Sequence, residues 1–399
     1  MSEIKVNSIK GVGASTAAIT VNNTDGSCTA NITNNLSNRN LIINGAMQVA
    51  QRSTSSTTSG YATVDRWTIQ YSSTGVTVTQ SQQATSSSDE PYQNGFQNFA
   101  RIALASAGTA SAGTYIEFQQ RMEAQNIANS GWNFKSSSSN ITVSFWLRAS
   151  TNQTFYGYLG TSDGTAQRYT FSFTASGNNA WTKITKTIPG NSNLDFDDDN
   201  GQGLHLILVP FYGTSYTNNK TLDTWAASDN ANFMPDMAST WLTAGASTFD
   251  ITGVQIEVGS VATDFEHRSF GQELALCQRY FYAMLDGTLA LCENATMYSS
   301  SNPFFSVPFP VEMRIAPSLE VSDGSQHFLK YENGGGTTFQ TLSRDGITST
   351  KIAAMNASVS GTFDVGGNAS VGGTLNVTGS AGLTGNINLG NATADTVVV

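Results

Sequence analysis

Residues 359–399 carry a twelve-residue repeat in which the apolar side chains keep their register through three copies. Four columns of the repeat show this register: Val359, Val371 and Leu383; Gly361, Gly373 and Gly385; Phe363, Leu375 and Ile387; Val365, Val377 and Leu389. Each copy alternates apolar with small or polar residues, which is the two-residue period of a β-strand. Because one copy buries only a thin face, such units become stable by stacking on neighbours or on other chains. We therefore expect residues 351–399 to form a stalk of β-repeats in a homotrimer.

The length and composition of the chain favour a globular β protein. At 399 residues the chain exceeds what one hydrophobic core usually serves, so we expect two or three domains. Charged residues make up only 12% of the sequence, about half the usual share. Val, Ile, Phe, Tyr and Thr recur with a two-residue alternation that disordered chains lack. The sequence therefore predicts an all-β protein.

Charge, cysteine content and hydropathy argue against several classes of function. The net charge of −10, with no local cluster of Lys and Arg, argues against binding to nucleic acid. Cys28, Cys277 and Cys292 are widely spaced and form no CxxC pair, which disfavours a zinc site and a disulfide framework. No segment approaches the roughly 18 apolar residues that span a bilayer, and no signal-peptide pattern begins the chain. We expect a soluble protein made in a cytosol, without membrane insertion and without a cofactor.

Four segments follow from the distribution of strand and turn signals. Residues 1–39 hold short apolar alternations around turns, which indicate an extended N-terminal arm. Residues 40–268 contain a series of strand-like segments separated by Ser, Gly and Asn turns, which predicts a β-sandwich. These segments are VTVTQSQQ, ITVSFWLRAS, FYGYLG, RYTFSFTAS, WTKITKTIPG, GLHLILVPFYG and FDITGVQIEVG. Residues 269–350 form a small β-rich module, and residues 351–399 form the stalk.

The side-chain pattern also predicts which faces are buried and where helices lie. In ITVSFWLRAS the inward face is expected to consist of Ile141, Val143, Phe145 and Leu147. Two segments favour short helices, IEFQQRMEAQ at 116–125 and SFGQELALCQRYF at 269–281. In the second, Leu274, Cys277 and Phe281 share one face at helical spacing.

Five motifs occur in an order that is similar to a known family. They are NLIINGAMQVAQR at 40–52, GYATVDRW at 60–67, QQRMEAQNIAN at 119–129, ITVSFWLRAS at 141–150 and FDITGVQIEVGSVATDFEHRSFGQELALCQRYF at 249–281. Together they resemble a family of phage virion proteins, most of them tail fibres of marine and cyanobacterial phages. The resemblance covers well over half of the chain, and Asp264 departs from the proline that the family commonly has at this position.

The resemblance implies a fold and a set of partners. It implies a jelly-roll β-sandwich related in shape to carbohydrate-binding modules, followed by a smaller module and a trimeric stalk. The arm at 1–39 would attach to the virion, and the chain would assemble in the host cytoplasm and reside in the virion tail. Expected partners are other virion proteins of the tail or an adaptor, and a glycan of the host surface. The family offers no agreed binding residues, so a site has to be sought in the sequence itself.

The polar segment at 211–241 is the candidate binding site. It is a long, turn-rich excursion that nevertheless carries four large aromatic residues: Tyr212, Tyr216, Trp225 and Trp241. Sugar rings present C–H faces to aromatic rings and hydroxyls to polar side chains, and this segment supplies both kinds of group. The alternative is that these aromatics pin the loop onto the sandwich or face a neighbouring subunit.

The acidic run NLDFDDDNGQG is a candidate for an ion site. Asp195, Asp197 and Asp199 have the alternate spacing of a calcium loop, but Asn200 and Leu206 stand where such a loop needs Gly and Glu. The pattern favours a solvated turn over an ion, so we expect no metal.

No motif of a familiar catalytic type occurs in the sequence. GxSxG, HExxH and Walker patterns are all absent. We therefore expect no catalytic residues and no enzyme, and we favour a structural tail fibre that recognises a host glycan. The alternatives are a head fibre, collar fibre or adaptor without a receptor role and, less favoured, a tailspike that degrades polysaccharide.

Overall fold

The computed structural model describes residues 38–284, except residue 178, and residues 303–318. It also describes the shorter stretches 6–10, 12–13, 18–21, 24, 28–30, 296–297, 328–332, 335–339 and 351–354. Apart from its first four residues, the predicted stalk at 351–399 lies outside the described residues. The trimeric stalk therefore stays a prediction, as do the domain boundaries.

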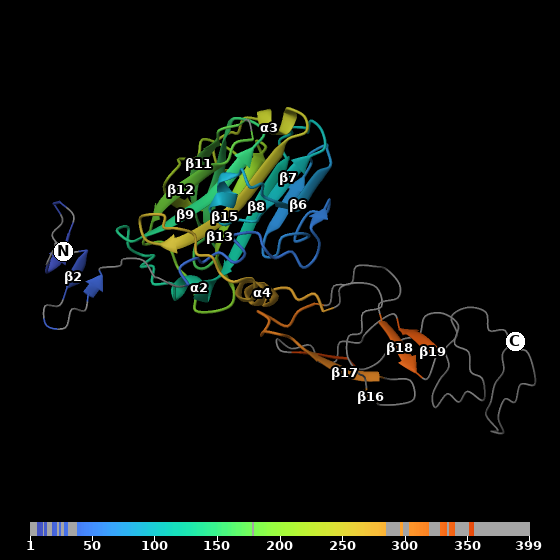
Figure 1. Cartoon of the computed structure of the whole chain (residues 1–399). Helices are drawn as coiled ribbons and strands as arrows, with labels where there is room; N and C mark the ends of the chain where they lie inside the picture. The colour runs from blue at the N-terminus through green and yellow to red at the C-terminus, as the bar shows by residue number, and fades with distance from the viewer. Residues whose placement is uncertain are drawn as a thin grey trace, which may run out of the picture.

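Two large antiparallel sheets pack face to face in the main body (Figure 1). The first has the strand order β14 (Trp225–Ala227), β11 (Gln167–Ala175), β10 (Gln153–Thr161), β13 (Gln202–Tyr212), β8 (Tyr115–Glu123) and β5 (Thr68–Ser72). The second has the order β12 (Thr182–Pro189), β9 (Asn140–Ala149), β15 (Thr248–Val258), β7 (Asn98–Leu104), β6 (Val78–Ala84) and β4 (Ser55–Ser56). The predicted all-β sandwich is confirmed.

The remaining described elements are short. The helices are α1 (Glu90–Gln93), α2 (Ala124–Ala128), α3 (Thr240–Thr243) and α4 (Phe270–Gln278). The outlying strands are β1 (Ser8–Ile9), β2 (Ile19–Val21), β3 (Cys28–Ala30), β16 (Thr296–Met297), β17 (Pro303–Pro308), β18 (Phe328–Glu332), β19 (Gly335–Phe339) and β20 (Lys351–Ala354). In Figure 1, α2 and α4 lie at one end of the sandwich, here called the base, and α3 lies at the other end. Within the described chain, every helix is too short or too polar to cross a membrane.

The space between the two sheets holds the hydrophobic core. The side chains predicted to point inward from β9, namely Ile141, Val143, Phe145 and Leu147, are all completely buried, which confirms that prediction. Phe145 meets Phe173 of the facing sheet edge-on, with ring centroids 5.3 Å apart. Burial of one such side chain stabilises the fold by about 1.5–3 kcal/mol.

The segment 116–125 corrects one of the two helix predictions. It forms most of β8 and only the first residues of α2, because β8 is a central strand paired with β13 on one side and β5 on the other. Ile116 and Phe118 point into the core, so the strand pairing and burial of this segment override the helix propensity of its Glu, Gln, Arg and Met residues. The second helix is confirmed as α4, which begins with a capping box between Ser269 and Gln272.

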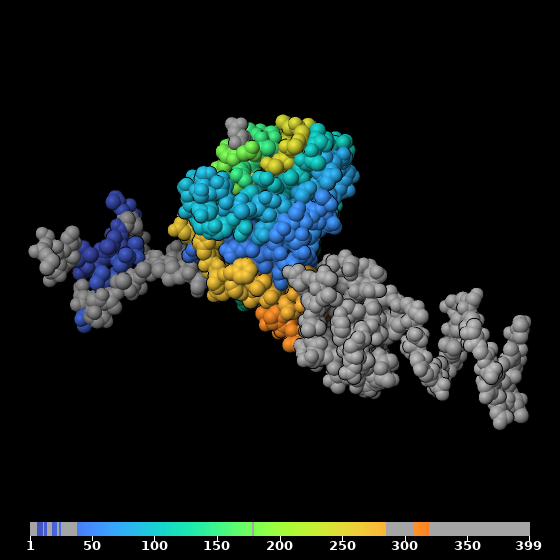
Figure 2. Space-filling model, turned by 45° about the vertical axis from the view of Figure 1, so that its right-hand side comes forward, coloured from blue at the N-terminus to red at the C-terminus, as the bar shows by residue number. Residues whose placement is uncertain are grey.

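The chain that follows α4 stays attached to the base. The guanidinium of Arg279 donates to both carboxylate oxygens of Glu123 at 2.8 Å. Arg314 donates its backbone N–H to the carbonyl of Arg279 at 2.8 Å and accepts from the Asn200 amide at 2.6 Å. In Figure 2 the orange segment that contains Arg314 lies directly against the gold residues around α4. Glu312 and Arg314 therefore contact the base.

Candidate functional site

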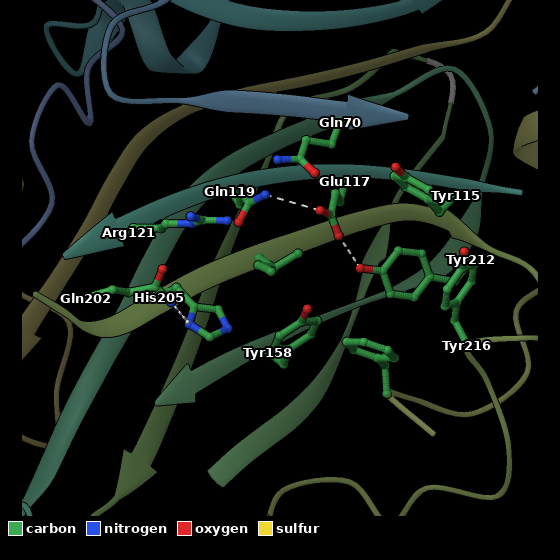
Figure 3. Close-up of a pocket in the computed structure, with 12 residues that line it drawn as sticks. Gln70, Tyr115, Glu117, Gln119, Arg121, Tyr158, Gln202, His205, Tyr212 and Tyr216 are labelled. Carbon is green, nitrogen blue, oxygen red and sulfur yellow. Dashed lines mark hydrogen bonds between the residues drawn. The ribbon is translucent and has the colours of Figure 1, made fainter. Parts of the chain in front are cut away.

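A groove crosses the outer face of the first sheet, on the side away from the core (Figure 3). Its volume is about 310 Å³, and its lining is Gln70, Tyr115, Glu117, Gln119, Arg121, Tyr158, Gln202, His205, Ile207, Tyr212, Tyr216 and Phe233. We call it the outer groove. Successive side chains of a strand point to opposite faces. Strand β8 therefore turns its even-numbered side chains toward the core and its odd-numbered ones toward the groove. Four of the lining residues come from β8 alone.

One end of the outer groove is aromatic. Tyr212 lies opposite Tyr115 across β13 and β8. The ring of Tyr216 packs against both, with centroid distances of 5.8 Å to Tyr115 and 5.4 Å to Tyr212. Phe233 lies 5.5 Å from Tyr212 and 5.6 Å from Tyr158, again between ring centroids. These five rings form one continuous apolar surface with polar hydroxyls at its edge.

The segment 213–237 builds the wall of this aromatic end. It folds back over the sheet and is held by backbone pairing, since Phe233 donates to the carbonyl of Tyr216 at 2.8 Å. The hydroxyl of Thr170, on the outer face of β11, donates to the carbonyl of Phe233 at 2.7 Å. Tyr216 and Phe233 are therefore fixed above the sheet by the loop and by β11 together.

Beneath this wall lies a buried arginine. The guanidinium of Arg168 stacks on the ring of Phe233 at 3.7 Å and faces Tyr158 at 4.8 Å. It donates to the carbonyl of Asp229 at 2.8 Å and to the hydroxyl of Ser228 at 2.9 Å. Burial lowers the pKa of Arg168 from its ordinary value. Arg168 thus anchors the loop by hydrogen bonds and cation–π contacts.

A carboxylate stands where the aromatic end meets the polar part of the groove. Glu117 accepts hydrogen bonds from the Tyr212 hydroxyl and, at 3.1 Å, from the Gln119 amide. Burial raises the pKa of Glu117, and the hydrogen bond from Tyr212 opposes that effect. In Figure 3 the carboxylate points between Gln119 and Tyr212, so both of its oxygens have partners within the groove.

The other end of the outer groove is basic and polar. Arg121 lies opposite His205 across β8 and β13, and His205 lies opposite Gly160 of β10. The amide nitrogen of Gln202 donates to His205 Nδ1 at 2.9 Å, which leaves the proton of the neutral imidazole on Nε2. Burial, followed by the charges of Arg168 and Arg121, lowers the pKa of His205 to about 3. His205 is therefore a neutral hydrogen-bonding group at physiological pH.

The four residues predicted as a binding site fall into two groups. Tyr212 and Tyr216 line the outer groove, and their role in binding stays a prediction. Trp225 is only 8% exposed and donates its indole N–H to the carbonyl of Pro189 at 2.7 Å. Trp241 is fully buried and donates to the carbonyl of Thr248 at 2.9 Å. For Trp225 and Trp241 the structure agrees with the alternative, in which the aromatics pin the loop onto the sandwich. Their indoles pack in the main core while their N–H groups find backbone partners, so the prediction of these two as groove residues is corrected.

The sequence analysis missed the face of β8 that supplies Tyr115, Glu117, Gln119 and Arg121. The signal was present, because 115–122 alternates these residues with Ile116, Phe118, Gln120 and Met122. It was masked by the helix-favouring composition of the same segment. Gln70, Gln202 and His205 join the site only through cross-strand pairing, which the sequence alone does not reveal.

Comparison with known proteins adds limited information. No family model matches the sequence, and no curated protein matches it. Among solved structures, the enzymatically active domain of tailspike protein 4 of bacteriophage CBA120 has 12% identity and a TM-score of 0.29, over 55% of this chain and 21% of that one. A putative sugar-binding protein from Bacteroides thetaiotaomicron has 11% identity and a TM-score of 0.30, over 55% of this chain and 100% of that one. The N-terminal cellulose-binding domain of Cellulomonas fimi β-1,4-glucanase C has 11% identity and a TM-score of 0.26, over 54% and 99%. Similarity at this level assigns no function, so the outer groove has to be interpreted from its own residues.

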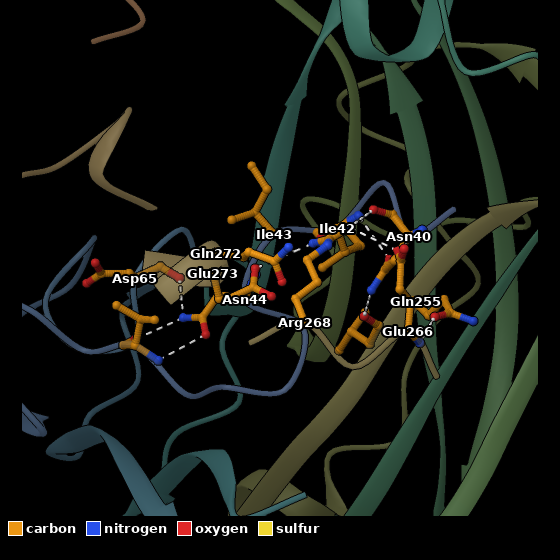
Figure 4. A network of polar contacts seen from close by, with 12 residues as sticks. Asn40, Ile42, Ile43, Asn44, Asp65, Gln255, Glu266, Arg268, Gln272 and Glu273 are labelled. Carbon is orange, nitrogen blue, oxygen red and sulfur yellow. Dashed lines mark hydrogen bonds and ion pairs between the residues drawn. The ribbon is translucent and has the colours of Figure 1, made fainter. Parts of the chain in front are cut away.

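A second concentration of polar side chains lies at the base, where residues 40–44 meet residues 266–273 (Figure 4). Arg268 donates to the carbonyls of Ile42, at 3.0 Å, and Asn40, and it pairs with Glu266 at 3.2 Å. The backbone N–H groups of Asn40 and Asn44 in turn donate to Glu266 at 2.8 Å and to Glu273 at 2.5 Å. We call this set the base network. Its polar groups satisfy one another, so it is a structural joint between two distant segments.

The acidic run at 195–199 has protein partners in the structure. Asp195 pairs with Lys135 at 3.1 Å, and Asp199 accepts from the backbone N–H of Gly201 at 2.8 Å. Asp198 accepts from the amide of Asn129 at 2.8 Å. Across the part of the chain that the structure describes, no group of three or more His, Cys, Asp or Glu side chains is placed to hold a metal ion.

Proposed function

We propose that the sandwich binds a glycan in the outer groove. The observation that carries this proposal is the juxtaposition of Tyr115, Tyr212 and Tyr216 with amide, carboxylate and guanidinium groups along one concave surface. A sugar ring combines apolar C–H faces with a rim of hydroxyls. Aromatic rings contact the faces, while amides such as Gln70 and Gln202 both donate to and accept from hydroxyls. Concave sites with a few placed polar groups are typical of ligand binding.

Binding without cleavage fits the charged groups of the groove. Hydrolysis of a glycosidic bond uses two carboxyl groups on either side of the bond, about 5–9.5 Å apart. Among the lining residues, Glu117 is the single carboxylate, and both of its oxygens already accept hydrogen bonds from Tyr212 and Gln119. We therefore favour a binding module over a hydrolase.

We further propose that the chain is a fibre protein of a phage virion, with three copies joined through the repeat at 351–399. This part rests on the sequence resemblance and on the repeat, which needs partner strands. In such a fibre the arm at 1–39 contacts another virion protein, and the sandwich carries the glycan-binding groove toward the host surface. If the chain is found away from the host-facing tip in purified virions, it is instead a head fibre, a collar fibre or an adaptor.

The test of glycan binding uses the full chain on an array of bacterial surface oligosaccharides, followed by calorimetric titration of the best ligand. The variant Tyr216→Ala removes a half-buried ring of the groove, and Tyr92→Ala removes an exposed tyrosine of α1 as a matched control. Stacking on one aromatic is worth about 0.5–1.5 kcal/mol beyond area burial, so we expect Tyr216→Ala to weaken binding severalfold or more. Equal binding by both variants, or no binding of any glycan by the parent chain, would overturn the proposal.

A further inference from the structure

Charge is distributed unevenly along the outer groove. The outer face of β8, on the side of the groove, carries Tyr115, Glu117, Gln119 and Arg121 in that order. At roughly 3.4 Å per residue, the backbone positions of Glu117 and Arg121, four residues along β8, lie roughly 14 Å apart. The single carboxylate thus belongs to the aromatic end, whereas the guanidinium of Arg121 belongs to the opposite end.

In the part of the chain that the structure describes, Arg121 is the basic group of the groove that lacks a directly bonded partner. Burial raises the pKa of Glu117, and the charge of Arg121 opposes that rise. Among the described residues its guanidinium makes no hydrogen bond and no ion pair, and its side chain is exposed. Arg168, in contrast, is buried beneath Phe233 and hydrogen-bonded to the loop. The cross-strand neighbour of Arg121 is His205, which is neutral and so neither pairs with Arg121 nor repels an anion.

The surroundings of Arg121 suit an anion that arrives with a ligand. On β13, beside the strand that carries Arg121, the Gln202 amide lies 2.9 Å from His205 Nδ1, while the Nε2 N–H of the neutral ring lies over Gly160, on the side away from Arg121. A planar guanidinium binds carboxylate, sulfate or phosphate oxygens through two parallel hydrogen bonds. At the other end, Glu117 repels an anion, so a ligand with one acidic group is oriented in a single direction along the groove.

We infer that the outer groove is specific for an acidic glycan, whose anionic substituent binds Arg121 while a neighbouring sugar ring stacks on Tyr216 and its aromatic neighbours. The substituent is a uronic acid carboxylate or a sulfate or phosphate ester. This inference rests on the proposed glycan binding and adds the chemical class and the orientation of the ligand.

The test compares paired oligosaccharides that share sugar sequence and linkage and differ by a single carboxylate, sulfate or phosphate. The full chain is screened against all pairs, and the best pair is titrated against the parent chain, Arg121→Gln, Arg121→Lys and the control Lys183→Gln. Lys183 is an exposed residue of β12 in the other sheet, so its variant changes the net charge equally without touching the groove.

We expect the acidic member of the best pair to bind at least about tenfold more tightly than its neutral partner, a difference of about 1.4 kcal/mol, because hydrogen bonds between charged groups are stronger than neutral ones. Arg121→Gln should abolish this preference, Arg121→Lys should retain part of it, and Lys183→Gln should leave it unchanged. The array also distinguishes a carboxylate from a sulfate or phosphate.

Equal affinity for neutral and acidic members, unaffected by Arg121→Gln, would overturn the inference and leave glycan binding itself intact. Loss of binding in the Tyr216→Ala variant alone would then locate the ligand at the aromatic end. Failure of every oligosaccharide to bind the parent chain would overturn both the inference and the proposed function.

Discussion

The imidazole of His205 occupies the space directly over Gly160. A Cβ built on Gly160 would lie 2.3 Å from His205 Nε2, which is closer than real Cβ atoms come to a neighbour. The two residues face each other across β13 and β10, so the glycine is what allows the ring to lie across the sheet at the floor of the groove. Any larger residue at 160 would have to displace this ring.

We expect Gly160→Ala to alter the groove more than the fold. Overpacking typically costs about 1–3 kcal/mol, and here the obstacle is the end of a side chain that can rotate away. Glycan affinity should fall severalfold in calorimetry, with a decrease of a few degrees in melting temperature. Gly113→Ala is the control, because nothing lies within 4 Å of a Cβ at that position. Unchanged affinity in Gly160→Ala would show that the position of His205 does not matter for binding.

We expect His205 to make the protein less stable as the pH falls. Its pKa is lowered from 6.5 to about 3 in the folded chain, so the unfolded chain takes up a proton first. The free energy of unfolding should therefore decrease between pH 6.5 and pH 3, and this part of the decrease should be missing in His205→Gln. Urea denaturation of both chains at pH 7.5, 5.5 and 4.5 measures the difference. Parallel pH profiles would mean that His205 titrates normally.

We expect Trp225→Ala to destabilise the fold and Tyr216→Ala to spare it. Trp225 is nearly buried, lies 5.5 Å from Tyr169 between ring centroids, and donates to Pro189. Truncation of a buried tryptophan costs about 3–5 kcal/mol. Calorimetry should show a melting temperature lowered by several degrees for Trp225→Ala and by little for Tyr216→Ala. The reverse order would place Tyr216 in the structural core.

We expect Arg268→Ala to destabilise the base strongly. The change leaves Glu266 and Glu273 without their cation and two backbone carbonyls without their donor. Removal of one partner from a buried ion pair costs about 3–5 kcal/mol. Chemical denaturation should show this loss, whereas Lys183→Ala on the exposed face of β12 should change stability by less than about 0.5 kcal/mol. A loss below about 1 kcal/mol for Arg268→Ala would mean that the base network is dispensable.

Much of the sandwich could be predicted from local pattern. The inward face of β9 and the helix at α4 follow from periodicities of two and of three to four residues, and both were predicted correctly. The strand at β8 was not, because a local sequence rich in helix formers became a central strand through its neighbours. Because β8 was predicted as a helix, the site was missed: this strand supplies a third of the residues that line the groove.

The candidate site could be predicted only in part. Aromatic content drew attention to 211–241, and two of its tyrosines do line the groove. Composition could not distinguish them from Trp225 and Trp241, because burial depends on what packs above a side chain. Arg121, His205 and Gly160 lie opposite one another because of the strand register, which pairs residues 84 positions apart (121 and 205) and 45 positions apart (160 and 205) and leaves no local signal.

The base network also has a mechanical consequence. The Arg39 guanidinium donates a hydrogen bond to the carbonyl of Asp264, and the backbone N–H of Asn40 donates to the Glu266 carboxylate. The Gln51 amide donates to the carbonyl of Phe281 at 2.8 Å. The chain therefore enters and leaves the sandwich at the same end, through segments that are tied to each other. A pull applied between the arm and the chain beyond α4 loads these contacts in parallel, together with the hydrogen bonds that join Asn40 and Leu41 to β15. The shortest path between the two ends thus runs across the base, through hydrogen bonds and not along the strands of the two sheets.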